Sequence, residues 1–174
     1  MKNKIIKSNQ VYTANHGWLK SRHIFSFAEY IDYYNMWFWN MRVFNDDIID
    51  WNSWFWLHPH SNMEILTIML SWEITHSDDL WNKEVLKKWF IQTMSAGKWI
   101  LHSEENKSKE ETHLYQIWFL PKNLWKNPTY RDLSIDLKDN KLNLLCSDNK
   151  DDNVWFLDSD VKVYRWTFDK SQKF

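Results

Sequence analysis

The stretch Leu57-His58-Pro59-His60-Ser61-Asn62-Met63-Glu64 carries two histidines separated by one residue. Side chains alternate between the two faces of a β-strand, so the two imidazoles would share a face. A second pair with the same spacing, His102 and Glu104, adds an imidazole and a carboxylate. Two such pairs facing one another inside a β-barrel supply three nitrogens and one oxygen and leave positions open for substrate or water. We therefore predict a metal site formed by His58, His60, His102 and Glu104.

Other residues near these pairs allow different interpretations. Glu64 lies four residues after His60 and could also point inward, and the four predicted ligands could instead form a structural hydrogen-bond cluster. His76 and His113 could reach the same pocket, although a hydrogen-bonded barrel histidine is the commoner case. For His16 and His23 we expect packing or capping roles.

The rest of the chain reads as a series of short strands separated by turn-forming residues. This spacing is typical of an all-β sandwich or barrel. The stretch 122–131, with Pro121 before it and Pro128 within it, is expected to be a linker. The predicted strands are Ile24 to Phe27, Met41 to Phe44, Glu64 to Leu70, Phe90 to Met94, Leu114 to Leu120, Leu142 to Leu145 and Val161 to Phe168.

Charge and composition argue against several classes of protein. The formal net charge of -1 gives no basic surface for nucleic acid. The longest apolar runs fall far short of the ~20 residues of a membrane-spanning helix. The start of the chain lacks the apolar segment of a secretory signal, and the single cysteine, Cys146, cannot form an internal disulfide. We therefore expect a cytoplasmic protein.

Tryptophan and glycine occur in abnormal numbers. The chain has 14 Trp and 2 Gly in 174 residues, where average usage would give roughly 12 glycines. Many of the tryptophans stand among residues typical of turns, and Trp81-Asn82 would be an ordinary turn if Trp81 were glycine. We hypothesise that UGA codons read as glycine in the source organism have been translated as tryptophan. Such tryptophans should lie exposed, in turns or at positive φ, a region that glycine adopts readily. The alternative is a surface rich in genuine tryptophan that binds carbohydrate or aromatic ligands.

Several separated motifs, taken in order, resemble the pirin family. The resemblance is dense over residues 15–128 and sparse at Tyr164-Arg165-Trp166. The first general motif of the wider cupin superfamily is also met, and the second only loosely. The motifs are Gly17-Trp18-Leu19-Lys20-Ser21-Arg22-His23, Phe25-Ser26-Phe27-Ala28, the stretch quoted first, Met94-Ser95-Ala96-Gly97, His102-Ser103-Glu104 and Gln116-Ile117-Trp118.

The resemblance also bears on the tryptophans. Members of the family have tryptophan where this chain has Trp18, Trp118 and Trp166. They typically have glycine at nine other positions, which are Trp37, Trp51, Trp54, Trp56, Trp72, Trp81, Trp89, Trp99 and Trp125. This departure leaves the predicted ligands untouched.

The resemblance implies an all-β cupin barrel of jelly-roll type and places the family's iron ligands at His58, His60, His102 and Glu104. Glu64 would then lie behind the ligands. Pirins resemble bicupins, so we expect residues 1–130 to form an N-terminal metal-binding cupin domain and residues 131–174 to start a truncated second one.

The implied activity is that of a metal-dependent dioxygenase similar to quercetin 2,3-dioxygenase. It would act on a small flavonol-type aromatic substrate and dioxygen, with Glu104 as the catalytic base and Fe(II) as the metal. Mn, Co, Ni and Cu suit the same ligands. The alternative, also implied by the resemblance, is a non-enzymatic, iron-dependent redox sensor that docks on a regulatory protein partner. A metal-free barrel that binds sugars or other small molecules would be favoured if the four ligands failed to converge.

Overall fold

The computed structural model describes residues 5–152 and 154–167, and almost all of their regular structure is β-strand. This confirms the all-β prediction. The strands form sheets of seven, four and three strands, accompanied by two short 3-10 helices, η1 (Ser8–Gln10) and η2 (Lys150–Asp152). Neither helix in the described ranges is long and apolar enough to cross a membrane.

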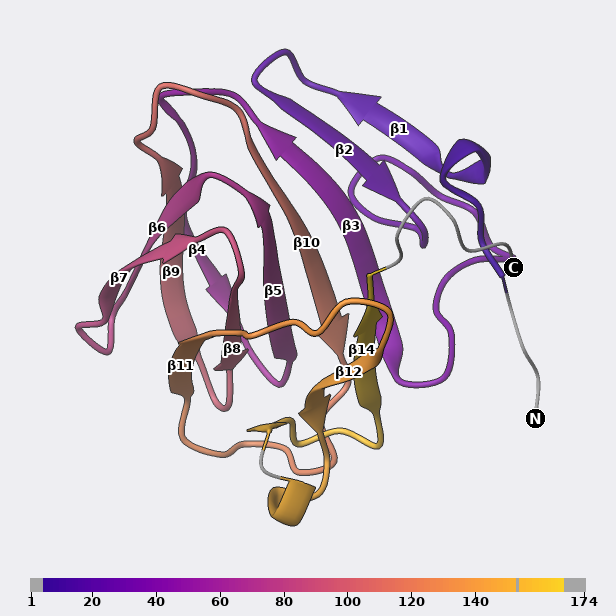
Figure 1. Ribbon diagram of the computed structural model, residues 1–174, viewed down its shortest axis with the longest axis vertical. Coiled ribbons are helices and arrows are strands. Elements are labelled where there is room, and N and C mark those ends of the chain that lie inside the picture. The colour runs from indigo at the N-terminus through magenta and orange to yellow at the C-terminus, as the bar shows by residue number, and fades with distance from the viewer. Residues whose placement is uncertain (1–4, 153, 168–174) are drawn as a thin grey trace.

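The seven-stranded sheet is the largest of the three, and all its pairings are antiparallel. In spatial order its strands are β1 (Tyr12–Asn15), β2 (Leu19–His23), β3 (Met41–Ile49), β10 (Thr112–Phe119), β5 (Glu64–Ser71), β8 (Phe90–Ser95) and β11 (Thr129–Ser134). Figure 1 shows them running from β1 and β2 at the right of the view to β11 at the left.

The four-stranded sheet carries the predicted ligands. Its strands, in spatial order, are β4 (Ser53–His60), β9 (Ile100–Asn106), β6 (Glu73–Asp78) and β7 (Lys83–Lys87). A smaller sheet of β13 (Trp155–Phe156), β12 (Leu142–Ser147) and β14 (Lys162–Trp166) lies near β11 and the lower end of β10 (Figure 1).

The two larger sheets face one another across the site. Gln116 on β10 is hydrogen-bonded to Glu104 on β9, and the rings of Trp118 on β10 and His60 on β4 lie 4.8 Å apart. Strand β3 shows how the sequence builds this interior, because every second side chain from Val43 to Ile49 is buried. Apolar residues stand at the ends of that buried row and polar residues in its middle.

Several strand predictions need revision. Residues 24–27 do not form a strand, because the chain turns there through a bridge between Phe27 and Tyr30. Strand β3 continues past Phe44 to Ile49, because it stays paired with β2 and β10 over that length. Its polar residues Asn45 and Asp47 face the interior. The expected linker 122–131 ends in β11, which pairs with β8. The expected domain boundary at 130/131 falls within β11, so the two-cupin division stays a prediction. Phe168, the expected end of the last strand, lies outside the described residues.

Eight of the nine suspected tryptophans lie where the glycine hypothesis expects them, and the exception is Trp54, which is half-buried within β4. Among the described residues, nine non-glycine residues have positive φ and five of these are tryptophans, including Trp81 at 70° and Trp89 at 73°. Trp72 and Trp125 also have positive φ, while Trp37, Trp51, Trp56 and Trp99 are exposed. A left-handed conformation costs an ordinary L-residue roughly 1–2 kcal/mol. The structural expectation is confirmed at those eight positions, and the codon assignment remains a prediction.

Candidate metal centre

The three predicted histidines come from two adjacent antiparallel strands. His58 and His60 lie on β4, and His102 lies on β9 directly opposite His58. The register of these strands shifts between Phe55 and His58, so the pairing changes just before the first ligand. Residues that are directly opposite one another project to the same face of a sheet. The three imidazoles therefore gather on the face that looks toward the larger sheet.

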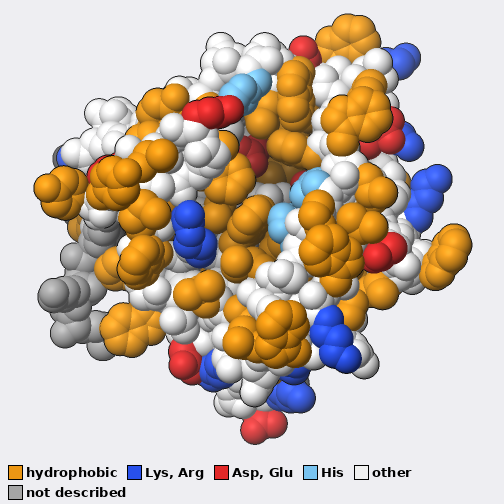
Figure 2. All heavy atoms as spheres, turned by 180° about the vertical axis from the view of Figure 1, so that it is seen from behind, with side chains coloured by type: hydrophobic (Ala, Val, Ile, Leu, Met, Phe, Trp, Pro, Cys, Tyr) orange, Lys and Arg blue, Asp and Glu red, His pale blue; other side chains and the backbone are white. Residues whose placement is uncertain are grey.

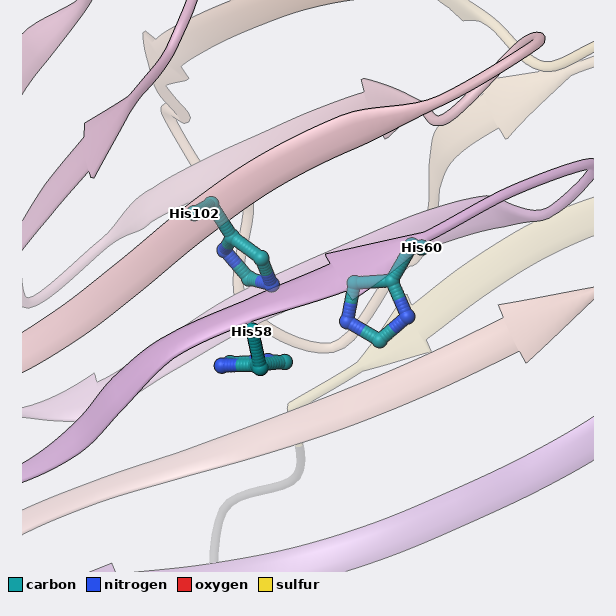
Figure 3. A group of neighbouring side chains, drawn as sticks. All are labelled: His58, His60 and His102. Atoms are coloured by element: carbon teal, nitrogen blue, oxygen red, sulfur yellow. The ribbon is translucent and has the colours of Figure 1, made fainter.

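The imidazoles converge closely enough to share one ion. One ring nitrogen from each of His58, His60 and His102 lies within 4.8 Å of the others. The ring centroids are 4.3 Å apart for His58 and His102, and 4.9 Å apart for each of the other two pairs. Figure 3 shows the three rings turned toward a common space between the strands.

Glu104 belongs to a second, overlapping group. Its carboxylate lies within 4.8 Å of ligand atoms of His102 and His76, so His102 is the member that both groups share. Glu104 is two residues beyond His102 on β9 and stands opposite His76 on β6. Gln116 Nε2 donates a hydrogen bond of 2.9 Å to Glu104 Oε2, which fixes the carboxylate and leaves Oε1 free to bind.

The sequence indicates only that His76 could reach the pocket. Its side chain is fully buried, and Nε2 lies 2.9 Å from Asp78 Oδ2 while Nδ1 has no partner among the described residues. A carboxylate that holds one ring nitrogen fixes the tautomer and orientation of the imidazole. The spacing of His76 and Asp78 on one strand face is the signal that could have indicated this.

Burial holds His60 and His102 in the neutral form that metal ligation requires. Burial, followed by the neighbouring His58, lowers the pKa of His60 to about 4. Burial, followed by His58, His60 and His76, lowers the pKa of His102 to about 2. His58 Nδ1 lies 2.6 Å from the carbonyl oxygen of Trp56. Because a carbonyl only accepts, Nδ1 donates and Nε2 keeps the lone pair for an ion.

Unpartnered buried atoms provide the test of whether a metal fits. His60 Nε2, both ring nitrogens of His102 and Glu104 Oε1 are buried and make no hydrogen bond to any described residue. A buried polar atom without a partner costs roughly 1–3 kcal/mol of folding free energy, so this cluster destabilises the fold unless a ligand or ion binds to it. Three imidazole nitrogens and a carboxylate oxygen suit a divalent transition metal. The donor set therefore fits a bound ion.

A cavity of about 510 Å³ opens onto the centre. His58 and Glu104 form part of its wall, and apolar side chains such as Trp18, Phe27 and Leu57 form another part. Figure 2 shows histidine side chains in a hollow framed by hydrophobic side chains. The volume lies within the range of small-molecule sites, about 300–1,000 Å³.

The remaining histidines divide between this cavity and the surface. His16 and His23 both line it, and the ring of His23 also packs edge-on against Phe27 at 5.2 Å. The packing role expected for His23 is therefore only part of its environment. His113 instead lies 2.5 Å from Asp46 and does not line the cavity.

Glu64 lies apart from the histidines. It is buried on β5, accepts a hydrogen bond of 2.6 Å from Ser95 Oγ, and lines a different cavity beside Lys126 and Asp158. It appears in neither group of candidate ligands among the described residues. This geometry favours Glu104 over Glu64 as the carboxylate of the centre.

Comparison with known proteins gives a consistent result. The pirin family model matches residues 5–119. A quercetin 2,3-dioxygenase of Escherichia coli K12 is 42% identical over 168 residues, which cover 96% of this chain and 72% of the relative.

Solved structures agree with the sequence relatives. The crystal structure of YhhW from Escherichia coli matches with a TM-score of 0.88 and 42% identity, over 92% of this chain and 68% of that one. The bacterial pirin YhhW in complex with nickel(II) matches with a TM-score of 0.86 and 42% identity, over 92% and 69%. The backbone and the sequence thus lead to one assignment, and the chain belongs to the pirin family of cupin-fold proteins.

Proposed function

We propose that this protein is a metal-dependent dioxygenase acting on flavonol-type aromatic substrates, with iron(II) held by His58, His60, His102 and Glu104. The observation that carries the proposal is the set of buried, unpartnered donor atoms of His60, His102 and Glu104 beside an apolar cavity of about 510 Å³. The name of the Escherichia coli relative, quercetin 2,3-dioxygenase, supports the reaction class. The nickel(II) complex of YhhW supports a metal in the equivalent fold.

A bound divalent metal would supply Lewis acidity and a template for adjacent hydroxyl and carbonyl oxygens of the substrate. The protein supplies the remaining roles. Gln116 holds Glu104 Oε2, so Oε1 is the atom left for the ion. Glu104 would accept the proton of the substrate hydroxyl when Oε1 leaves the ion or shares it with the substrate. The aromatic and aliphatic wall with Trp18 and Phe27 excludes water around a planar ring.

Metal identity is set by more than this donor set. Three histidines and one glutamate also accommodate manganese, cobalt, nickel or copper, and availability in the cell decides among them. We propose iron(II), and metal analysis of protein isolated from its natural source tests this assignment. Another metal at full occupancy would replace iron in the proposal.

Ligand substitutions test the site and the activity together. His58→Ala and His102→Ala should each abolish metal occupancy and flavonol-dependent consumption of dioxygen. Glu104→Gln should lower the turnover by roughly 10²–10⁴, as expected for a lost general base. It should also weaken metal binding, because Gln116 donates to Oε2 and a glutamine would keep that bond by turning its NH2 group toward the ion. His113→Ala is the matched control, because this histidine lies outside the cavity beside Asp46.

The outcome also separates the enzyme from a regulatory protein. Metal-loaded protein that consumes no dioxygen with any flavonol would overturn the dioxygenase proposal. Binding to a protein partner that depends on the oxidation state of the metal would then support the redox-sensing function.

A further inference from the structure

A row of polar residues lines the cavity on the side formed by β2 and β3. Ser21 and His23 on β2, and Asn45 and Asp47 on β3, are each 2–3% exposed and all border the cavity. Ser21 stands opposite Asp47, and His23 stands opposite Asn45. Their side chains therefore share one face of the sheet. We call these four residues the β2–β3 wall.

The wall continues directly into the metal centre. Asn45 stands opposite Gln116 on β10, and Gln116 donates the hydrogen bond that holds Glu104. His23, Asn45 and Gln116 thus lie side by side on three adjacent strands. His58, Glu104 and the β2–β3 wall border the same cavity. A ligand that meets His58 and Glu104 with one edge therefore has the wall beside it.

Each residue of the wall has a buried polar atom that makes no close hydrogen bond within the described chain, namely Ser21 Oγ, His23 Nδ1, Asn45 Oδ1 and Asp47 Oδ1. Ser21 and Asp47 stand opposite one another and the Ser21 hydroxyl partly satisfies the Asp47 carboxyl group, so His23 and Asn45 are the members with no partner in the wall. Buried polar groups in native proteins are almost always satisfied, so unsatisfied ones on residues that border a cavity indicate a binding partner there. Asn45 Oδ1 accepts hydrogen bonds, and the Asp47 carboxyl group accepts when ionised and also donates when protonated, so both fit a hydroxyl group, which can donate and accept.

We propose that the β2–β3 wall is a hydrogen-bonding subsite that selects substrates with hydroxyl groups on the ring remote from the edge that meets the metal. This inference rests on the proposed function and defines its substrate class more closely. The wall makes a polyhydroxylated aromatic the fitting ligand, whereas a bare aromatic offers its buried polar atoms no hydrogen bond. Sites built to bind hydroxyl groups discriminate strongly against analogues that lack them.

A pair of ligands separates the two ends of the cavity. Quercetin carries two hydroxyls on its remote ring, and galangin (3,5,7-trihydroxyflavone) differs from it only in lacking those two. Their dissociation constants are measured on the metal-loaded full chain by tryptophan fluorescence or calorimetry without oxygen. The parent protein should bind quercetin at least about tenfold more tightly, since each hydrogen bond to a buried group is worth about three- to tenfold.

Substitutions in the wall should remove this preference. Asn45→Leu should weaken quercetin binding about three- to tenfold more than galangin binding, and Asp47→Leu about ten- to hundredfold more. Thr67→Val is the matched control, because its hydroxyl is equally buried and unpartnered but does not border the cavity. The control should leave the ratio of the two affinities unchanged.

The results distinguish the subsite from the reaction. Equal affinities for the two ligands in the parent, or losses of equal size for both ligands in Asn45→Leu and Asp47→Leu, would overturn the subsite even if quercetin is consumed. A preference that depends on the wall, without any consumption of dioxygen, would support the subsite and overturn the dioxygenase proposal. Circular dichroism of each variant checks that it is folded. If Asp47→Leu fails this check, Asn45→Leu decides the test alone.

Discussion

Asp47 illustrates how a binding residue can cost stability. Its carboxyl group is buried on β3, and burial raises its pKa from 3.8 to about 7. The Ser21 hydroxyl and the charge of His113 oppose this shift, and the charge of Asp46 adds to it. Between these pH values the folded protein holds a proton that the unfolded chain has lost. Stability therefore falls as pH rises from about 4 to 7.

Asp47→Asn should relieve this cost. At pH 8 the variant should be more stable than the parent by as much as about 4 kcal/mol, from about 3 pH units at about 1.4 kcal/mol each. The gain should disappear as pH falls toward 4, because the parent is then protonated in both states. Urea unfolding of the metal-free proteins at several pH values measures the difference. A gain independent of pH would show that the titration of Asp47 is not its source.

The tryptophans give a prediction at the level of single codons. The coding DNA should carry TGA at positions 37, 51, 54, 56, 72, 81, 89, 99 and 125, and TGG at 18, 118 and 166. The intact mass of the protein from its natural source should match nine glycines at the TGA positions. TGG at every position would end the hypothesis and leave the exposed tryptophans as genuine surface residues.

Two of the turns between strands contain tryptophans from this set. Trp81 lies in the hairpin between β6 and β7, and Trp89 lies between β7 and β8, both at positive φ. Trp81→Gly and Trp89→Gly should each stabilise the protein by about 1 kcal/mol, because relief of the left-handed strain exceeds the entropy that glycine adds to the unfolded chain. Chemical denaturation of the variants checks this.

Trp118→Gly serves as the contrasting variant. The Trp118 side chain donates from Nε1 to Gln116 Oε1 at 3.1 Å and packs beside the core cluster of Ile65 and Met94. Its loss should destabilise the protein by about 3–5 kcal/mol. If Trp81→Gly and Trp89→Gly were equally destabilising, the strain assigned to these turns would be wrong.

The sequence predicted the metal-binding strands of the site but not its polar wall, and the reason is physical. His58 and His60 on β4, and His102 on β9, could be placed because their spacing matches the period of a strand. The β2–β3 wall could not, because Asn45 and Asp47 interrupt the apolar alternation between Val43 and Ile49 and look like surface residues. Only the pairing of β2 with β3 shows that these polar residues share an enclosed face.

The two facing sheets together make metal binding a property of the whole fold. Iron(II) or nickel(II) at about 100 times its dissociation constant should stabilise the folded protein by about 2.7 kcal/mol and raise the melting temperature by roughly 5–10 °C. Calorimetry with and without the metal measures the shift. His102→Ala should lose it and His113→Ala should keep it. An equal shift in both variants would mean that the ion binds elsewhere.

Strand β4 is the edge of its sheet and, within the described chain, pairs with β9 alone. Pro59 lies between its two histidines and contributes no amide hydrogen to that pairing. An edge strand held on one side separates from its neighbour more readily than an interior one. An ion held by His58 and His60 on β4 and by His102 on β9 would act as a cross-link between them. Metal occupancy would then govern how often this edge opens, and each opening would in turn give the ion a route to exchange with solvent.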